Sequence, residues 1–429
     1  MIPAMSEPVD PSRYHFVPGG SGPTIVGGEG SYLLTDDGRR ILDGAGGAIV
    51  ANIGHGRSEV ADAVHDSMRT NAYVVPLWPT PNRLKLIDTL CSRWLPDGFD
   101  HVFFTSGGSE SADSSIRLAR AYHLAKGRPD RWKIIGRHPS YHGITVGAIA
   151  AASHTGRRAG YEPLLLDFPK VPWDDAEAVL KVIEQEDPAT IAGFLFEPIT
   201  GAAGGCLSAS DEYWRTVNEI CKAHDILLIA DEVMTGFGRT GRTWGHQHFP
   251  VEPDVIYGGK GLGGGYVPMG MVATTGRVAR ALADSGSPFM FFTFTGGDAM
   301  CAGAVKVLEI LEAEDLVARS ATMGEVLRRR LTEELGDHPN VLDIRGRGLF
   351  FGIELVADRE TGEPFAADVK FAARVVAECL ARDVWVYPAG SGPVRDAVML
   401  GCPFTISDAE IDQLVTTLKA GIEAALLTR

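Results

Sequence analysis

Short runs of apolar residues alternate with longer amphipathic segments through the middle of the chain, and this alternation limits its fold more than any other feature. Uninterrupted apolar runs of this length are typical of strands that are covered on both faces, as in a parallel sheet. The runs occupy residues 102–104, 133–135, 191–196, 226–230 and 255–257.

The segments between these runs have the periodicity of helices. In residues 210–224, Tyr213, Val217 and Ile220 recur at four- and three-residue spacing behind Ser210, a residue suited to capping a helix. The alternation of strands and helices predicts an α/β domain with right-handed crossovers.

The two ends of the chain have a different pattern. Residues 32–41 form two β-type runs around an Asp-Gly turn, which predicts a hairpin. After a long helical segment that starts at Asp315, residues 341–355 are strand-like and spaced by glycine, and residues 366–381 and 408–427 are helical again.

We therefore expect two domains. Residues 66–320 form a large domain around the parallel sheet. Residues 1–65 and 321–429 come from the two termini and join in a smaller α+β domain.

Composition narrows the function classes. Forty basic against fifty-five acidic residues give a net charge of −15, which argues against a nucleic-acid partner. No apolar run approaches the roughly 20 residues that span a bilayer, and no signal peptide is visible, so we expect no membrane association. The six cysteines are scattered without a Cys-x-x-Cys pair, which favours a reducing compartment, by default the cytoplasm.

The first candidate site is the glycine-rich turn that follows residues 102–104. Gly107, Gly108 and Ser109 open a helix there, and the free N–H groups at a helix start suit a phosphate. Taken alone, a turn of this kind is more often a simple helix cap.

The second candidate is Asp231, at the end of the run 226–230. Carboxylates at the carboxyl end of a strand face the crevice where open α/β sheets bind ligands. A solvated carboxylate at a strand exit is the alternative.

The third candidate is Lys260, which lies between glycines after the run 255–257. Glycines allow a planar ligand to approach the backbone, and a desolvated amine becomes a nucleophile. A phosphate-binding P-loop is excluded because Gly261 stands where Ser or Thr is required. A flexible loop with an exposed lysine is the alternative.

The residues from Asp231 to Lys260 also carry a specific resemblance. The pattern Asp-Glu-Val-x-x-Gly-x-Gly-Arg-Thr-Gly, then Pro-Asp and Gly-Lys, resembles the signature of the class III aminotransferases, or ω-transaminases. These are fold-type-I enzymes that depend on pyridoxal 5'-phosphate. The likeness runs from about Tyr32 to the C-terminus. It implies an α/β fold with a large domain around a mostly parallel seven-stranded sheet.

The resemblance assigns the two catalytic residues. It implies that Lys260 holds the cofactor as a Schiff base and then moves the proton, and that Asp231 pairs with the protonated pyridine nitrogen. The implied reaction moves an amino group from an amine, ω-amino acid or amino acid donor to a small 2-oxo acid by a ping-pong mechanism.

The resemblance also implies the other cofactor contacts. Tyr141 stacks on one face of the pyridine ring, with His142 beside it, and Val233 lies against the other face. Glu197 is near the cofactor, and Gly107, Gly108 and Ser109 form the phosphate cup. Thr293 reaches the phosphate of a neighbouring subunit, which implies a homodimer.

Departures from the family pattern concern the substrate. Ile49 stands where several relatives carry a pocket tryptophan, and Trp78 can supply aromatic surface instead, although a core or interface role fits it equally well. Met399 stands where relatives that use glutamate carry an arginine, so we expect pyruvate as the acceptor. Arg395 is the nearest arginine that can bind a carboxylate, and an exposed loop arginine is the alternative.

Rival functions remain open at this point. An aminomutase or amino-acid racemase uses the same cofactor residues. A nicotinamide-dependent oxidoreductase is disfavoured because its glycine fingerprint is absent, and an inactive binding module because Lys260 and Asp231 are both present. We assign no metal site, because His246 and His248 lack a third ligand at suitable spacing.

Overall fold

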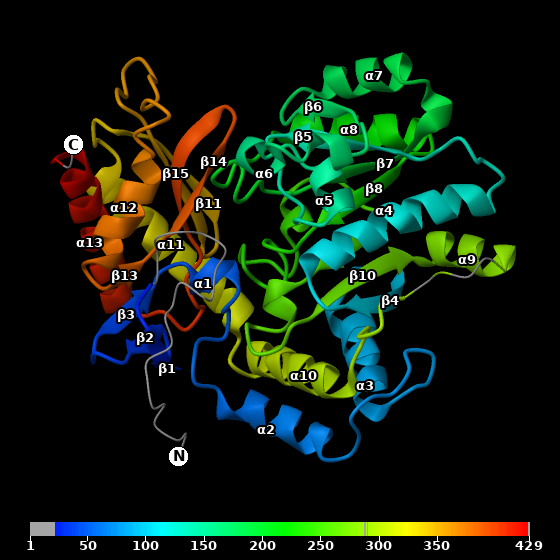
Figure 1. Cartoon of the computed structure of the whole chain (residues 1–429), viewed down its shortest axis with the longest axis horizontal. Helices are drawn as coiled ribbons and strands as arrows, with labels where there is room; N and C mark the ends of the chain where they lie inside the picture. The colour runs from blue at the N-terminus through cyan, green and yellow to red at the C-terminus, as the bar shows by residue number, and fades with distance from the viewer. Residues whose placement is uncertain (1–21, 287–288, 290, 428–429) are drawn as a thin grey trace.

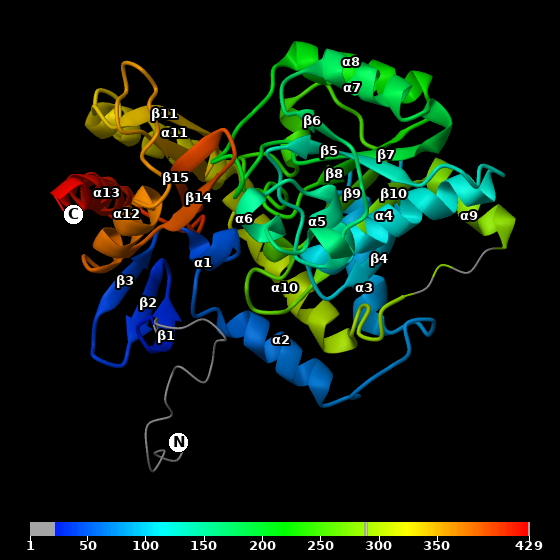
Figure 2. The same cartoon turned by 45° about the horizontal axis from the view of Figure 1, so that its top comes forward.

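The computed structural model describes residues 22–286, 289 and 291–427. The chain forms a larger part around one seven-stranded sheet and a smaller part around two four-stranded sheets, side by side in both cartoon views (Figures 1 and 2). This confirms the predicted fold class.

The central sheet is mostly parallel. Its strands lie in the order β4 (Phe99–Thr105), β10 (Gly270–Thr275), β9 (Val255–Gly258), β8 (Leu227–Asp231), β7 (Ile191–Phe196), β5 (Lys133–His138) and β6 (Lys170–Pro172). Only β10 runs antiparallel to its neighbours β4 and β9. The sequence predicted neither β10 nor the short edge strand β6.

Both faces of this sheet are buried, which explains the uninterrupted apolar runs. In β8, Leu227 and Ile229 pack in one core cluster, while Leu228 and Ala230 pack in another on the opposite face. The helices α4 (Gly108–Ala125) and α5 (Val146–Ala151) contribute to the first cluster. The helices α7 (Ala176–Gln185) and α8 (Asp211–Ala223) contribute to the second and lie together at the top of Figure 2.

The helix predicted for residues 210–224 is present in the larger part and buries one face, which includes Tyr213, Val217 and Cys221. Ser210 caps the helix there by accepting a hydrogen bond from the backbone N–H of Tyr213. The helices of the larger part are α2 (Ser58–Met68), α3 (Pro81–Thr89), α4 (Gly108–Ala125), α5 (Val146–Ala151), α6 (Thr155–Arg158), α7 (Ala176–Gln185), α8 (Asp211–Ala223), α9 (Gly276–Ser285) and α10 (Asp298–Ala313).

The smaller part joins both ends of the described chain. Leu42, near the N-terminus, pairs in parallel with Val384, near the C-terminus. One sheet contains β1 (Ile25–Glu29), β2 (Tyr32–Thr35), β3 (Arg40–Asp43) and β13 (Val384–Trp385), and the other β11 (Val341–Arg347), β12 (Phe350–Leu355), β15 (Val394–Leu400) and β14 (Tyr387–Ser391). The helices are α1 (Gly46–Ile49), α11 (Leu316–Leu335), α12 (Phe371–Leu380) and α13 (Asp408–Leu427).

Most predictions for the chain ends are confirmed. The hairpin around the Asp-Gly turn is β2 and β3, and the strand-like residues 341–355 form the antiparallel pair β11 and β12. The helix predicted for residues 366–381 was too long: α12 begins at Phe371, because Lys370 has a left-handed backbone (φ +49°) that a helix cannot include. The domain limits at residues 65 and 320 stay a prediction. None of the helices in the described ranges is long and apolar enough to cross a bilayer.

Candidate active site

The predicted site residues follow the carboxyl ends of five parallel strands. Gly108 follows β4, Tyr141 follows β5, Glu197 follows β7, Asp231 ends β8 and Lys260 follows β9. Because these strand ends lie at one edge of the sheet, the five residues line a single pocket, whose volume including its open mouth is about 590 Å³.

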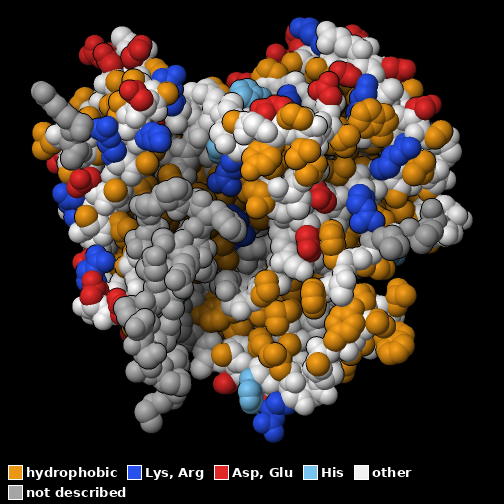
Figure 3. All heavy atoms as spheres, viewed as in Figure 1, with side chains coloured by type: hydrophobic (Ala, Val, Ile, Leu, Met, Phe, Trp, Pro, Cys, Tyr) orange, Lys and Arg blue, Asp and Glu red, His pale blue; other side chains and the backbone are white. Residues whose placement is uncertain are grey.

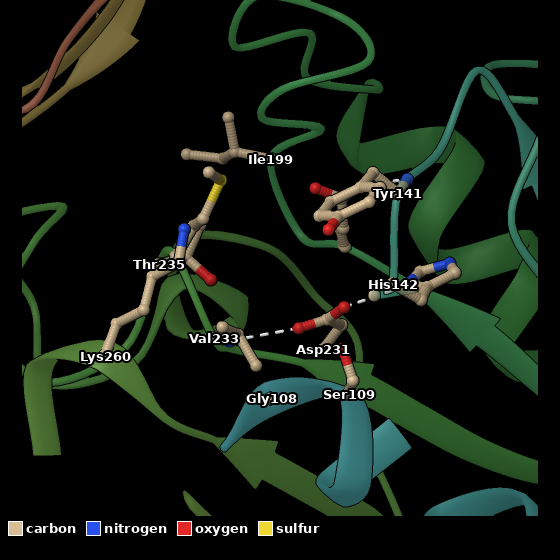
Figure 4. A pocket seen from close by; sticks show the side chains of 12 residues that line it. Gly108, Ser109, Tyr141, His142, Ile199, Asp231, Val233, Thr235 and Lys260 are labelled. Carbon is tan, nitrogen blue, oxygen red and sulfur yellow. Dashed lines mark hydrogen bonds and ion pairs between the residues drawn. The ribbon is translucent and has the colours of Figure 1, made fainter. Parts of the chain in front are cut away.

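The side chains converge from different sides (Figure 4). Lys260 and Tyr141 extend from opposite walls, and the carboxylate of Asp231 lies between them and lower in the view. His142, Val233 and Ser109 also line the pocket.

One wall of the pocket is the start of α4. The helix begins at Gly108, and Gly107 before it supplies no side-chain cap, so the first N–H groups of the helix have no acceptor within the helix. Together with the positive end of the helix dipole, they form an anion cradle. The hydroxyl of Ser109 accepts a hydrogen bond from the Ile144 N–H at 3.1 Å, which holds the next loop against the helix start.

Two glycines allow the segments of this wall to pack closely. A Cβ atom on Gly108 would lie 3.0 Å from Cγ1 of Val233. Gly143 has φ +129°, where other residues are strained, and a Cβ there would lie 2.5 Å from the hydroxyl of Ser109. A larger residue at either position would disturb the pocket wall.

The carboxylate of Asp231 is buried and held at both oxygens. Oδ2 lies 2.8 Å from Nδ1 of His142, and Oδ1 accepts a hydrogen bond from the Val233 N–H at 3.0 Å. The hydroxyl of Tyr257 lies 3.3 Å from the same His142 nitrogen. Burial, and then the charge of Asp231, raise the pKa of Tyr257 well above its ordinary value, so this phenol stays neutral.

The second ring nitrogen of His142, Nε2, takes no part in the contact with Asp231. Nε2 is buried and has no hydrogen-bond partner within the described part of the chain. A buried nitrogen without a partner costs free energy, so a bound group that reaches this atom would be stabilised.

Glu197 fixes the loop that carries Tyr141. Its carboxylate accepts hydrogen bonds from the backbone N–H groups of Tyr141 and Gly201, each at 2.9 Å. Burial is the main cause that raises the pKa of Glu197 to about 7, and the charge of Asp231 adds to it. Glu197 is therefore a positioning residue that binds a proton more readily than an exposed glutamate.

Lys260 lies where the chain turns sharply after β9. Its backbone has φ +35°, a strained value for a residue with a side chain, and it begins the short 3-10 helix η6 (Lys260–Leu262). Burial lowers the pKa of Lys260 to about 8, against the opposing charges of Asp231 and Glu197. The amine is therefore neutral, and nucleophilic, at a lower pH than an exposed lysine.

The pocket also contains residues that the sequence did not single out. They are Gly143, Ile199, Met234 and Thr235. Each lies within two residues of a predicted site residue, so the loops after the strands could have indicated them. The hydroxyl of Thr235 donates a hydrogen bond to the buried carboxylate of Glu232, which fixes the loop after β8.

Five predicted residues are not among those that line this pocket in the single chain, and the first of them, Gly107, directly precedes the lining residue Gly108. Ile49 is buried against Gly401, and Trp78 is 66% exposed. Nη1 of Arg395 donates a hydrogen bond to the Phe365 carbonyl at 2.7 Å. Thr293 is exposed, and its carbonyl accepts a hydrogen bond from the hydroxyl of Tyr73.

The chain is similar to known proteins along nearly its whole length. The family model described as aminotransferase class-III matches residues 21–422. The chain belongs to the class-III aminotransferases. It is 34% identical to a taurine–pyruvate aminotransferase of Rhodobacter capsulatus, over 93% of this chain and 91% of that protein.

Two further relatives extend the comparison. The chain is 33% identical to a putrescine–pyruvate aminotransferase of Pseudomonas aeruginosa, over 91% of this chain and 88% of that protein. Among solved structures, an aminotransferase of Bacillus anthracis superposes with a TM-score of 0.90 at 35% identity, covering 96% of this chain and 97% of that one.

Class-III aminotransferases depend on pyridoxal phosphate and act on amine donors and keto acids. The pocket of this member fits that cofactor. The start of α4 suits a phosphate, the cavity of about 590 Å³ has room for a planar ring, and Asp231 offers a held carboxylate.

Proposed function

We propose that this class-III aminotransferase transfers an amino group from an amine or ω-amino acid to a small 2-oxo acid, with pyruvate preferred. The observation that carries the proposal is that Lys260 and Asp231 share one pocket with the anion cradle at Gly108. The names of the taurine–pyruvate and putrescine–pyruvate relatives support pyruvate as the acceptor.

We propose the following cofactor contacts. The N–H groups around Gly107, Gly108 and Ser109 bind the phosphate. Tyr141 and Val233 bracket the ring, because they line the same pocket from different strand ends. These contacts fix the position of the ring before the substrate enters.

Asp231 binds the ring nitrogen in this proposal, with His142 behind it. The hydrogen bonds from Val233 and His142 orient the carboxylate, so the charge is in place before the reaction begins. Glu197 acts indirectly in this proposal: it holds the backbone of Tyr141, which contacts the ring.

Bound in this pocket, pyridoxal phosphate supplies an aldehyde carbon for the amino group and a conjugated ring that spreads negative charge. Nζ of Lys260 accepts the proton that leaves the substrate carbon bearing the amino group, and returns it when the 2-oxo acid is the substrate. A pKa of about 8 suits this exchange, because the amine can both accept and release a proton near neutral pH.

We propose that the enzyme is a homodimer in which Thr293 reaches the neighbouring site. Large apolar side chains are exposed around this residue, which is unusual for a monomer surface. Figure 3 shows apolar side chains gathered at the lower right, where Figure 1 places α3 and the segment that precedes it. The exposed residues of this segment and of the Thr293 loop include Tyr73, Val75, Leu77, Trp78, Phe291 and Phe294.

The predicted substrate contacts fit this arrangement unequally. Trp78 lies on the same apolar face, so we propose that it contacts substrate only in the dimer. Ile49 is buried in the single chain, and its position gives no support to a substrate contact. Arg395 keeps its proposed role as a carboxylate ligand only if its hydrogen bond to Phe365 is broken.

We propose a cytoplasmic location. All six cysteines are free, and all but Cys91 are buried, which is compatible with a reducing compartment.

The decisive experiment separates the two half-reactions. The holoenzyme is mixed with an amine in the absence of a keto acid, and the cofactor absorbance is followed. We expect conversion of one cofactor per active site and then no further reaction until pyruvate is added. Continued turnover without an acceptor would instead identify an aminomutase or a racemase.

A panel of acceptors then tests the preference for pyruvate. We expect kcat/KM for pyruvate to exceed that for 2-oxoglutarate, because Met399 is apolar and cannot pair with a carboxylate. A strong preference for 2-oxoglutarate would contradict the proposal.

A further inference from the structure

The short helix α6 places an arginine beside the pocket. The guanidinium carbon of Arg157 lies 4.3 Å from the ring centroid of Tyr141, which lines the pocket together with Lys260. In both cartoon views α6 lies next to β14, between the larger and the smaller part (Figures 1 and 2).

Other arginines of this region are engaged in holding the fold. Arg137 donates hydrogen bonds to the carbonyls of Glu197 and Trp173. Arg239 is buried and donates to two carbonyls, at Leu349 and Cys402. Such guanidinium groups cannot turn toward a substrate without leaving a buried carbonyl unpaired.

Of the two adjacent arginines of α6, one is bonded to backbone carbonyls and the other is not. Arg158 donates to the carbonyls of Ile149, Ala150 and Ala152. Arg157 forms no ion pair with a carboxylate of the described residues; its partner is Tyr141, whose ring it covers and whose side chain it also hydrogen-bonds. A guanidinium stacked on an aromatic ring keeps its N–H edge available for an anion.

The start of the helix that carries Arg157 is bonded to the smaller part. The backbone N–H of Thr155 donates a hydrogen bond to the hydroxyl of Ser391 at 2.8 Å, and the two hydroxyls lie 3.0 Å apart. Ser391 is the last residue of β14. The start of α6 is therefore tied to the end of β14 in the smaller part.

The charge of Arg157 acts on the groups of the site. Burial, and then Arg157, lower the pKa of His154, whose ring contacts Tyr141 edge to face. After burial, Arg157 is also among the charges that lower the pKa of Lys260. Arg157 is thus close enough to act electrostatically on the pocket, although it is not itself among the residues that line it, whereas Asp231 and Glu197 are.

We propose that Arg157 binds the acid group of the substrate, so that it selects 2-oxo acids and acidic donors over uncharged carbonyls and amines. A guanidinium offers two parallel N–H donors to a carboxylate, or to the sulfonate of a sulfonic acid. This proposal rests on the proposed function, and it assigns to Arg157 the role that the sequence suggested for Arg395.

The test compares two acceptors that differ in the acid group. The holoenzyme is first converted with n-butylamine, and its reaction with pyruvate is then compared with its reaction with butanal. We expect Arg157→Met to lower kcat/KM for pyruvate about 10- to 100-fold, the loss expected for one bidentate charged pair, and to change that for butanal by less than about threefold. Arg157→Lys should recover part of the activity with pyruvate.

Control variants distinguish the loss of the Arg157 charge from a disturbance of the pocket structure. Arg329→Met removes an exposed arginine on α11 and should leave both reactions unchanged. Equal losses with pyruvate and butanal in Arg157→Met would show that Arg157 only supports Tyr141, and would overturn the proposal. A selective loss of the pyruvate reaction in Arg395→Gln, with none in Arg157→Met, would overturn it as well.

Direct binding gives a readout that does not need turnover. Calorimetric titration of the holoenzyme with propanoate should show binding that Arg157→Met weakens about 10-fold or more, whereas propanamide should bind both proteins equally weakly. If wild-type holoenzyme did not react with amines at all, the proposed function would fail, and this titration would still decide the role of Arg157. Equal propanoate binding by both proteins would contradict it.

Discussion

Nδ1 of His142 lies 2.8 Å from Oδ2 of Asp231, and both side chains are buried. His142 belongs to the loop after β5, whereas Asp231 ends β8, two strands away in the sheet. The pair therefore fixes the inner wall of the pocket across β7, and it holds the carboxylate that we assign to the ring nitrogen of the cofactor.

Asp231→Asn should reduce transamination by about 100-fold or more, because an amide cannot stabilise a protonated ring nitrogen. Cofactor absorbance and single-turnover rates measure this effect. Tyr257→Phe removes only a neutral hydroxyl 3.3 Å from His142, so we expect less than about a 10-fold loss. Comparable losses in the two variants would contradict the role given to Asp231.

Lys260→Ala should abolish covalent attachment of the cofactor and lower the rate of amine conversion by at least about 1,000-fold. Borohydride reduction followed by peptide mass spectrometry locates the attachment. Lys181→Ala, at an exposed position on α7, serves as the matched control. Cofactor found on another lysine in the wild-type protein would refute the assignment.

Glu197 should make stability depend on pH in the acid range. Burial raises its pKa from the ordinary 4.5 to about 7 in the folded protein, so between these values the folded state holds a proton that the unfolded state has lost. The contribution of Glu197 to stability is therefore largest below pH 4.5 and falls as the pH rises toward 7.

The comparison is with Glu197→Gln, which cannot ionise. Denaturant midpoints of the two proteins, measured between pH 4.5 and 7.5, should show the wild type losing stability relative to the variant as the pH rises. A constant difference across this range would show that Glu197 keeps an ordinary pKa.

Gly108→Ala should weaken cofactor binding roughly 10-fold, because the new Cβ would lie 3.0 Å from Cγ1 of Val233 and displace one wall of the pocket. The double variant Gly108→Ala with Val233→Ala relieves this contact and should bind the cofactor more tightly than Gly108→Ala alone. Equilibrium dialysis of the cofactor measures both. Absence of this partial recovery would mean that the crowding arises elsewhere.

Thr293 is best tested by mixing subunits. If Thr293 of one chain completes the site of its partner, a dimer of one Lys260→Ala chain and one Thr293→Val chain contains one intact site. We expect activity to appear when the two variant proteins are unfolded and refolded together, at up to about a quarter of the wild-type level by random pairing. Refolding each variant alone is the control, and no gain on mixing would argue against a shared site.

The strands that end at the site were predictable because their runs are buried on both faces, and their polar ends are visible in the sequence. Asp231 and Lys260 stand at such ends, and the structure brings them into one pocket. The strand β10 was missed because its residues, Gly-Met-Val-Ala-Thr-Thr, are neither a long apolar run nor a clear alternation.

The limits of the sequence concern contacts between distant segments. The position of Arg157 beside Tyr141 depends on the loop after β5 and on the hydrogen bond from Thr155 to Ser391, more than 200 residues away. No local pattern contains such information. The same holds for the partner of His142, because periodicity cannot indicate which strand ends face one another.

The antiparallel strand β10 has a consequence for how the protein can be assembled. It separates β4 from β9, so the anion cradle and Lys260 come into register only after residues 270–275 have been inserted between them. Gly270, its first residue, packs so closely that a Cβ atom there would lie 2.4 Å from the hydroxyl oxygen of Thr105. Uptake of the cofactor should therefore report that β10 has been inserted into the large sheet, and fragments that stop before β10 should fail to acquire its absorbance.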